Sequence, residues 1–144
     1  MKPIAGIITS IMLIPGFFII MESSSSVNIA TPAPQETRFE KGKKIYDEKC
    51  VVCHQPNGKG IKSAFPPLAN SDYLLADKKR AVEQVLNGSN EEMLVNGVTY
   101  KTPMPPQLDN HEDAVAVINY VLNAWGNDGG TISLEEVKDI KIKR

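Results

Sequence analysis

Three side chains near the middle of the chain have the types and spacing needed to bind a metal cofactor covalently. Cys50 and Cys53 are separated by two residues, and His54 follows the second cysteine directly. This spacing is typical of c-type haem attachment. Each thiol can add to one vinyl group of the porphyrin, and the histidine then stands under the iron. The motif predicts one covalent haem c with its iron, and His54 as the first axial ligand.

Two other chemistries also use a Cys-x-x-Cys pair. A zinc site would need further Cys or His ligands, and the chain holds only these two cysteines with His54 and His111. A thiol-redox pair has no need of a histidine directly after it, and no strand-rich βαβ pattern surrounds this one. Haem attachment is the favoured interpretation, and a non-haem metal or thiol-redox protein with free Cys50 and Cys53 is a further hypothesis.

A haem iron held by His54 needs a second axial ligand, for which the chain offers two methionines after residue 21. Met104 lies in Thr102-Pro103-Met104-Pro105-Pro106, where three prolines fix φ and stiffen the loop. Met93 lies between charged and apolar residues, where core packing is the ordinary role of a methionine. His111 is the competitor, since two histidines can also ligate a c-type haem. We expect Met104 to be the second ligand.

The chain resembles a class I cytochrome c, a small helical electron carrier with one haem. The resemblance covers about residues 36 to 126 and rests on three stretches, namely 50–54, Phe65-Pro66-Pro67-Leu68, and Val95–Tyr100 leading into Pro103-Met104-Pro105. The last two stretches are similar to cytochrome c domains attached to bacterial copper nitrite reductases and oxidases. The resemblance implies an all-α fold of four to five helices around one covalent haem. It also implies a one-electron carrier that is not itself an enzyme.

The resemblance also assigns roles to residues around the haem. In relatives, a backbone carbonyl near the matching proline accepts the free N–H of the ligating imidazole, so Pro66 or Pro67 would supply that oxygen. Leu68 would pack on the porphyrin. Tyr100 is a candidate to wall the haem edge and reach a propionate, or it is an ordinary half-buried aromatic. The expected cofactor-binding residues are Cys50, Cys53, His54, Pro67, Leu68, Tyr100 and Met104, with His54 and Met104 on the metal.

The first 35 residues differ in composition from the rest. Lys2 is followed by an uncharged, mostly apolar run over 3–21, which predicts an export signal that is either cleaved or kept as a membrane anchor. Residues 22–35 are rich in Ser and Pro and are expected to be a linker. The cytochrome c domain is expected over 36–144. We therefore expect an exported protein, periplasmic or at the outer face of the cytoplasmic membrane, with a possible tether through residues 3–21.

Apolar residues at helical spacing predict the elements that position the haem motif. One face of the first helix carries Gly42, whose place in the resembling family permits close crossing with the last helix, where Tyr120 is available to meet it. Residues 88–109 are expected to form a loop over the distal side, and the basic tail to Arg144 is expected to fray. The helices are expected near 35–49, 71–75, 77–87, 110–125 and 133–136, with caps at Asn70 or Ser71, at Asn110 and at Ser133.

Charge and composition indicate the kind of partner. The 144 residues carry a formal net charge of −1, and the lysines are dispersed, so nothing favours nucleic acid. The expected partners are separate redox proteins: a reductase, an oxidase or a membrane quinol-oxidising complex. The run Lys78-Lys79-Arg80 is either a solvated face or part of a docking surface. The alternative function is a haem-based enzyme or gas sensor whose sixth ligand leaves easily.

Overall fold

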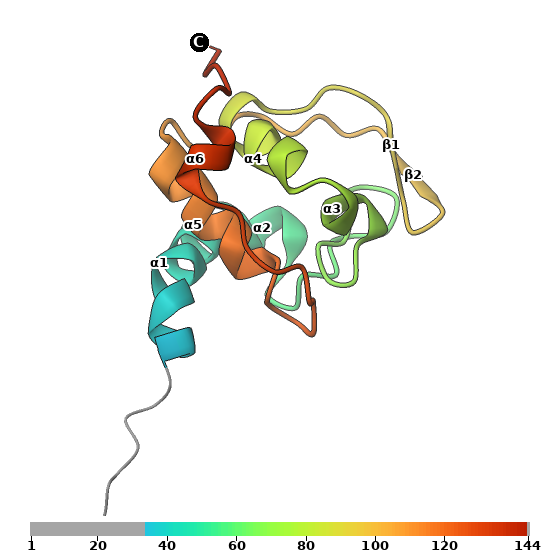
Figure 1. Cartoon of the computed structure of the whole chain (residues 1–144). Coiled ribbons are helices and arrows are strands. Elements are labelled where there is room, and N and C mark those ends of the chain that lie inside the picture. Colours follow the sequence, from blue (N-terminus) through green and yellow to red (C-terminus); the bar gives the residue numbers. More distant parts are fainter. Residues whose placement is uncertain (1–33, 144) are drawn as a thin grey trace, which may run out of the picture. The chain divides into compact units, whose positions relative to one another are not determined.

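The computed structural model describes residues 34–143, with side chains from Phe39 onward. This part contains six helices and one two-stranded sheet (Figure 1). In chain order the elements are α1 (Pro34–Lys49), α2 (Val51–His54), α3 (Asp72–Ala76), α4 (Lys78–Asn87), β1 (Met93–Val95), β2 (Val98–Tyr100), α5 (His111–Val121) and α6 (Leu134–Val137).

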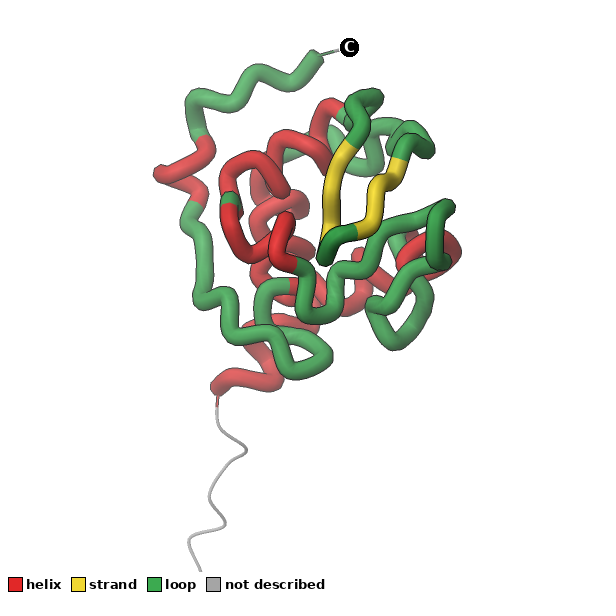
Figure 2. Tube along the Cα trace, turned by 90° about the vertical axis from the view of Figure 1, so that its right-hand side faces the viewer, coloured by secondary structure: helices red, strands yellow, loops and turns green. Residues whose placement is uncertain are grey.

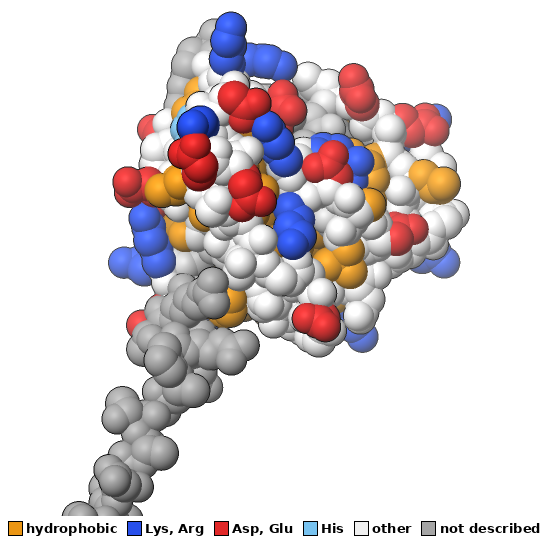
Figure 3. All heavy atoms as spheres, viewed as in Figure 1, with side chains coloured by type: hydrophobic (Ala, Val, Ile, Leu, Met, Phe, Trp, Pro, Cys, Tyr) orange, Lys and Arg blue, Asp and Glu red, His pale blue; other side chains and the backbone are white. Residues whose placement is uncertain are grey.

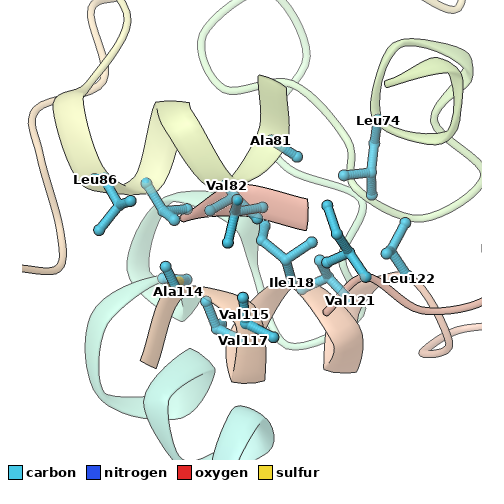
Figure 4. Packing of buried hydrophobic residues seen from close by; sticks show 14 of the residues in the cluster. Leu74, Ala81, Val82, Leu86, Ala114, Val115, Val117, Ile118, Val121 and Leu122 are labelled. Atoms are coloured by element: carbon cyan, nitrogen blue, oxygen red, sulfur yellow. The ribbon is translucent and has the colours of Figure 1, made fainter. Parts of the chain in front are cut away.

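The core forms where α5 packs against both α1 and α4. The buried side chains of α4 point toward those of α5, and Leu74 of α3 lies beside them (Figure 4). Val82, Leu86, Ala114 and Leu122 have no exposed surface. Burying such side chains supplies the main driving force for packing the helices together, at about 25 cal/mol per Å² of apolar surface.

Side-chain caps define where the helices begin, as the sequence predicts. Ser71 is the cap of α3, since its hydroxyl accepts the Leu74 N–H. Asn110 caps α5 by accepting the Asp113 N–H at 2.8 Å. Ser133 and Glu136 form the predicted capping box of α6. These caps satisfy backbone donors that have no partner within a helix.

The crossing of α1 and α5 depends on Gly42, which confirms the predicted close approach. A Cβ atom at this position would lie 2.1 Å from the Ala116 carbonyl oxygen and 2.7 Å from the Tyr120 Cβ. Beyond the crossing, Tyr120, Tyr46 and Trp125 form an aromatic cluster, with ring centroids 5.0–5.8 Å apart. The two helices can therefore approach so closely only because residue 42 has no side chain.

The expected small helical fold is confirmed, but the described residues contain six helices and a two-stranded sheet rather than four to five helices alone. The expected distal loop 88–109 contains two adjacent strands, β1 and β2, drawn in yellow in Figure 2. They pair in antiparallel fashion, with Met93 opposite Tyr100. Asn96 and Gly97 both have positive φ between the strands, as a type I′ hairpin turn requires, and Asn-Gly is a strong hairpin signal. The count rises to six because α2, at the haem motif, is a four-residue helix of its own.

The expectation that the C-terminal tail frays is also wrong as far as Lys143. Ile132, Val137 and Ile140 are buried. Two asparagine side chains of α4 and α5 hold the same segment. The Asn119 amide donates to the Ile132 carbonyl and accepts the Ile132 N–H. The Asn87 amide donates to the Lys141 carbonyl and accepts the Lys143 N–H. The segment is therefore part of the packed fold.

The predicted leader (1–21) and almost all of the predicted linker (22–35) lie outside the described residues. Both stay predictions. Within residues 34–143, no helix is long and apolar enough to cross a membrane.

Candidate functional site

One pocket brings together most of the residues that the sequence singled out. It is lined by α2, by the 65–68 loop, by one face of α4 and by the 102–105 loop. Most of the lining side chains are apolar. The predicted site residues among them are Cys50, Cys53, His54, Pro67, Leu68 and Met104.

His54 is held in one orientation at the end of α2. Its Nδ1 lies 3.0 Å from the Pro66 carbonyl oxygen, so Nδ1 carries the proton and donates it. The lone pair is then left on Nε2. Burial lowers the pKa of His54, and the Pro66 carbonyl opposes that shift. The ring is therefore neutral at pH 7, with one nitrogen ready to act as a metal ligand. Of the two prolines considered, Pro66 supplies the oxygen, and Pro67 lines the pocket beside it.

Cys50 is the N-cap residue of α2 and Cys53 lies within this helix, and the two cysteines do not form a disulfide. Burial raises the pKa of the Cys50 thiol to about 11, with a smaller contribution from Cys53. Redox-active thiols show the opposite shift, because their environment favours the thiolate. This environment disfavours the thiol-redox interpretation. Within residues 34–143, His, Cys, Asp and Glu side chains form no group of three or more that could hold a metal ion.

Met104 is fixed by its backbone. Its N–H donates to the Ser89 carbonyl, and its carbonyl accepts the Ser89 N–H, both at 2.8 Å. The Val85 carbonyl then accepts the N–H groups of Gln107 and Leu108, so the proline-rich loop is attached to the end of α4. The half-buried Met104 side chain contacts the core and lines the pocket.

Other predicted residues lie differently. Met93, which the sequence indicated as core filler, also lines the pocket from β1. Tyr100 is buried opposite Met93 but is not among the pocket-lining residues. His111 lies outside the lining, with its Nε2 2.9 Å from the Ile140 carbonyl oxygen. The pocket therefore contains two methionine side chains and one histidine.

Sequence reasoning missed several polar residues of the pocket. Tyr73, Arg80 and Gln84 line it from α3 and α4. The run 78–80 does not act as one surface: Lys78 donates to the Thr131 carbonyl, Lys79 pairs with Asp139, and Arg80 lies at the pocket. The signal available in the sequence was the helical spacing of Arg80, Ala81, Gln84 and Val85, which places all four on one face of α4.

Comparison with known proteins decides the family. The sequence model of the cytochrome c family matches residues 39–125. Cytochrome c-552 of Thermus thermophilus is 36% identical over 114 residues, which cover 72% of this chain and 86% of that protein. The chain belongs to the cytochrome c family. It is a class I c-type cytochrome with one covalent haem c and its iron, and it serves haem-based electron transfer.

Two further relatives are larger proteins that contain such a domain. The cytochrome c subunit of the quinone alcohol dehydrogenase of Gluconobacter oxydans is 26% identical over 104 residues, covering 69% of this cytochrome and 22% of the subunit. The cbb3-type oxidase subunit CcoP of Azospirillum brasilense is 38% identical over 55 residues, covering 34% and 19% respectively.

The pocket of this cytochrome c fits a haem. A porphyrin needs apolar walls, and most lining side chains are apolar. Its iron needs nitrogen or sulfur ligands, which His54, Met104 and Met93 can offer. Two thiols in the same turn as His54 can form the two thioether bonds.

Proposed function

We propose that this cytochrome c carries single electrons between separate redox proteins, with haem attached to Cys50 and Cys53 and bound axially by His54 and Met104. When bound, the haem supplies one-electron chemistry between ferric and ferrous iron. The observation that carries the proposal is the pocket itself, in which an oriented imidazole, two thiols and a backbone-fixed thioether share one apolar lining.

Each axial residue has a distinct task. The Pro66 carbonyl accepts the His54 Nδ1–H, which makes Nε2 more basic and keeps the ring from rotating. The Met104 thioether is a soft ligand that favours ferrous iron, so a His/Met pair raises the potential. The apolar lining excludes water that would otherwise stabilise the ferric charge. With both axial positions of the iron filled, no position is open to a substrate, so the proposed role is electron transfer without making or breaking bonds in a substrate.

Met104 is favoured over Met93 because of the way its backbone is held. Two hydrogen bonds to Ser89 and three neighbouring prolines restrict Met104, whereas Met93 lies at one end of a three-residue strand. A ligand that must stay in place in both oxidation states benefits from this rigidity, because little rearrangement then accompanies electron transfer.

The experiment on the sixth ligand compares two matched variants. The ferric protein is expected to show the weak near-infrared band that marks sulfur ligation of haem. We expect Met104→Ala to abolish this band and Met93→Ala to retain it. Loss of the band in Met93→Ala alone would assign the ligand to Met93 and overturn the proposal.

Covalent attachment is tested by mass spectrometry of the peptide that contains residues 50–54. We expect this peptide to carry the mass of one haem, and the Cys50→Ser and Cys53→Ser variants to retain at most one thioether bond. A purified, matured protein whose peptide lacks the haem mass would contradict attachment at this site.

The expected partners are a reductase, an oxidase or a quinol-oxidising complex on a separate chain, and the expected location is the periplasm or the outer face of the cytoplasmic membrane. Support comes from the relatives, which include subunits of a dehydrogenase and an oxidase. Val52, between the two cysteines, is 78% exposed, so a partner can approach close to the attachment turn. On the face shown in Figure 3, positive and negative side chains are interspersed, which suits brief contacts.

A further inference from the structure

A buried polar side chain, that of Asn127, lies in the turn that follows α5. The residue is 8% exposed and is not among those that line the haem pocket. Its Nδ2 donates to the Leu68 carbonyl at 3.0 Å and to the Val121 carbonyl at 2.6 Å. Its Oδ1 accepts the Asn70 N–H at 2.7 Å. Both donors of the amide are therefore used, and the side chain joins the end of α5 to residues 68–70.

The backbone of this turn is strained. Trp125 has φ +52° and is followed by Gly126 with φ +85°. A positive φ is uncommon for a residue with a bulky side chain, and it persists only where surrounding contacts hold it. Here the Trp125 Nε1 donates to the Pro56 carbonyl at 3.0 Å, and the Asn127 N–H donates to the Ala124 carbonyl at 2.9 Å. The turn therefore holds the Asn127 backbone in one place, from which its side chain reaches residues 68–70.

A stiff stretch of backbone connects Asn127 to the axial histidine. At its far end, the Pro66 carbonyl oxygen lies 3.0 Å from the His54 Nδ1 and accepts its proton. At its near end, the Leu68 carbonyl accepts a hydrogen bond from Asn127. A single residue, Pro67, separates the two carbonyl-bearing residues, and its ring fixes φ. A shift of the Leu68 carbonyl is therefore passed on to the Pro66 carbonyl and is not absorbed between them.

We infer that Asn127 is a positioning residue for His54: by holding the Leu68 carbonyl, it keeps the Pro66 carbonyl where the His54 Nδ1–H can donate to it. This inference rests on the proposed function, in which His54 binds the haem iron. Removing the Asn127 amide leaves buried backbone groups without a partner, which is costly, so the segment moves to satisfy them. An imidazole that loses its acceptor is less basic at Nε2.

The test compares Asn127→Leu with Asn119→Leu in the matured, haem-loaded protein. Asn119 of α5 is the matched control, because its amide also bonds backbone in both directions, to Ile132, which does not line the haem pocket. In the ferrous state, NMR should show the His54 Nδ1–H exchanging with solvent about fivefold faster in Asn127→Leu than in Asn119→Leu, which corresponds to about one net hydrogen bond. We expect only Asn127→Leu to raise the reduction potential, because a less basic imidazole stabilises ferric iron less.

The inference is overturned if the two variants show equal exchange of the His54 Nδ1–H, or if Asn127→Leu does not raise the potential above that of Asn119→Leu. If Asn127→Leu fails to mature, Asn127→Ser and Asn119→Ser are compared in the same way. In the unaltered protein the Nδ2 protons of Asn127 should be protected from exchange, and rapid exchange would also overturn the inference. The haem mass and the sulfur band of the unaltered protein test the proposed function separately, so each failure can be told from the other.

Discussion

The orientation of His54 depends on a backbone carbonyl, and that carbonyl depends on Gly60. Gly60 has φ +61°, and a Cβ there would lie 2.3 Å from the Phe65 carbonyl oxygen and 2.5 Å from that of Pro66. The Pro66 oxygen is the one that accepts the His54 Nδ1–H. The 55–60 turn and the imidazole are therefore coupled through one close backbone contact.

We predict that Gly60→Ala destabilises the protein by roughly 2–4 kcal/mol, since a left-handed conformation and a steric overlap both oppose the methyl group. It should also raise the reduction potential, because a displaced Pro66 carbonyl leaves His54 less basic. Denaturant unfolding and redox titration measure the two effects. Gly97→Ala is the control: Gly97 shares the positive φ, but no atom of residues 34–143 lies within 4 Å of the added Cβ. Equal potentials in the two variants would contradict the coupling.

At the scale of single residues, the sequence predicted what depends on local chemistry. Cys50, Cys53 and His54 share one turn, so their spacing alone places them together. The sequence left Pro66 and Pro67 as alternatives, because the choice depends on how the chain bends back. Arg80 was grouped with Lys78 and Lys79, since adjacent charges look alike until the helix phase relative to the pocket is known.

Among the helices, the α1–α5 crossing is the contact most sensitive to a single methyl group. Alanine would favour the helix at position 42 by about 1 kcal/mol over glycine. The added Cβ would overlap with the Ala116 carbonyl, which belongs to backbone and cannot rotate away. We predict that Gly42→Ala lowers the free energy of unfolding by about 1–2 kcal/mol. Lys44→Ala, on the exposed side of α1, should change the free energy of unfolding by less than about 0.5 kcal/mol. If Gly42→Ala were instead more stable than the unaltered protein, the two helices would be able to move apart without cost.

The same two helices are joined by an ion pair that makes their packing depend on pH. Lys41 of α1 lies 2.7 Å from Asp113 of α5. The hydrogen bond from Asn110, and then that from Lys41, hold the pKa of Asp113 below its ordinary value of 3.8. A lowered carboxyl pKa stabilises the fold above the unfolded-state value, and this contribution is lost as the pH falls through the folded-state pKa.

Asp113→Asn should therefore be less stable than the unaltered protein at pH 7, by about 0.5–1 kcal/mol. The difference should shrink to nothing as the pH falls below the folded-state pKa. Thermal unfolding across this range measures it. Glu112→Gln removes the same charge from the same turn and serves as the control, because no residue in the described part of the chain donates a hydrogen bond to that carboxylate. A difference that persists unchanged at low pH would exclude this ionisation as its cause.

The C-terminal segment is the element whose importance the sequence understated. Ile132 is 5% exposed, whereas Leu134 on the same segment is 45% exposed. We predict that Ile132→Ala lowers the free energy of unfolding by about 2–4 kcal/mol and that Leu134→Ala changes it by less than about 0.5 kcal/mol. Neither residue lines the haem pocket, so neither variant should alter the reduction potential. Equal and small effects of the two would mean that the segment is not part of the cooperative fold.

The predictability of the elements follows their length and periodicity. The helices α1, α4 and α5 have enough turns to show an apolar face, and the N-caps of α4 and α5, Asp77 and Asn110, are recognisable residue types. The hairpin β1–β2 has only three residues a strand, too few for alternation to stand out, although Asn96-Gly97 marks its turn. The segment that carries Ile132, Val137 and Ile140 has only one four-residue helix, too short for a repeated apolar period, so their burial could not be read from the sequence.

At the scale of the whole molecule, helices and loops surround a pocket in which a backbone carbonyl orients the imidazole and backbone hydrogen bonds hold the residue that carries the thioether. The Pro66 carbonyl orients the His54 ring, and Ser89 holds the Met104 backbone. An iron held on both sides by such groups can change its charge but has no position for another molecule. The alternative function, a gas sensor or a haem enzyme, requires one of these groups to leave.

Uptake of carbon monoxide by the ferrous, matured protein at neutral pH tests this central claim most directly. The gas binds ferrous haem only where an axial position is open, and its binding is followed in the visible absorption spectrum. We predict no change in the spectrum of the unaltered protein and rapid uptake by Met104→Ala, in which the position is vacant. Rapid uptake by the unaltered protein would contradict the claim that His54 and Met104 occupy both axial positions of the iron.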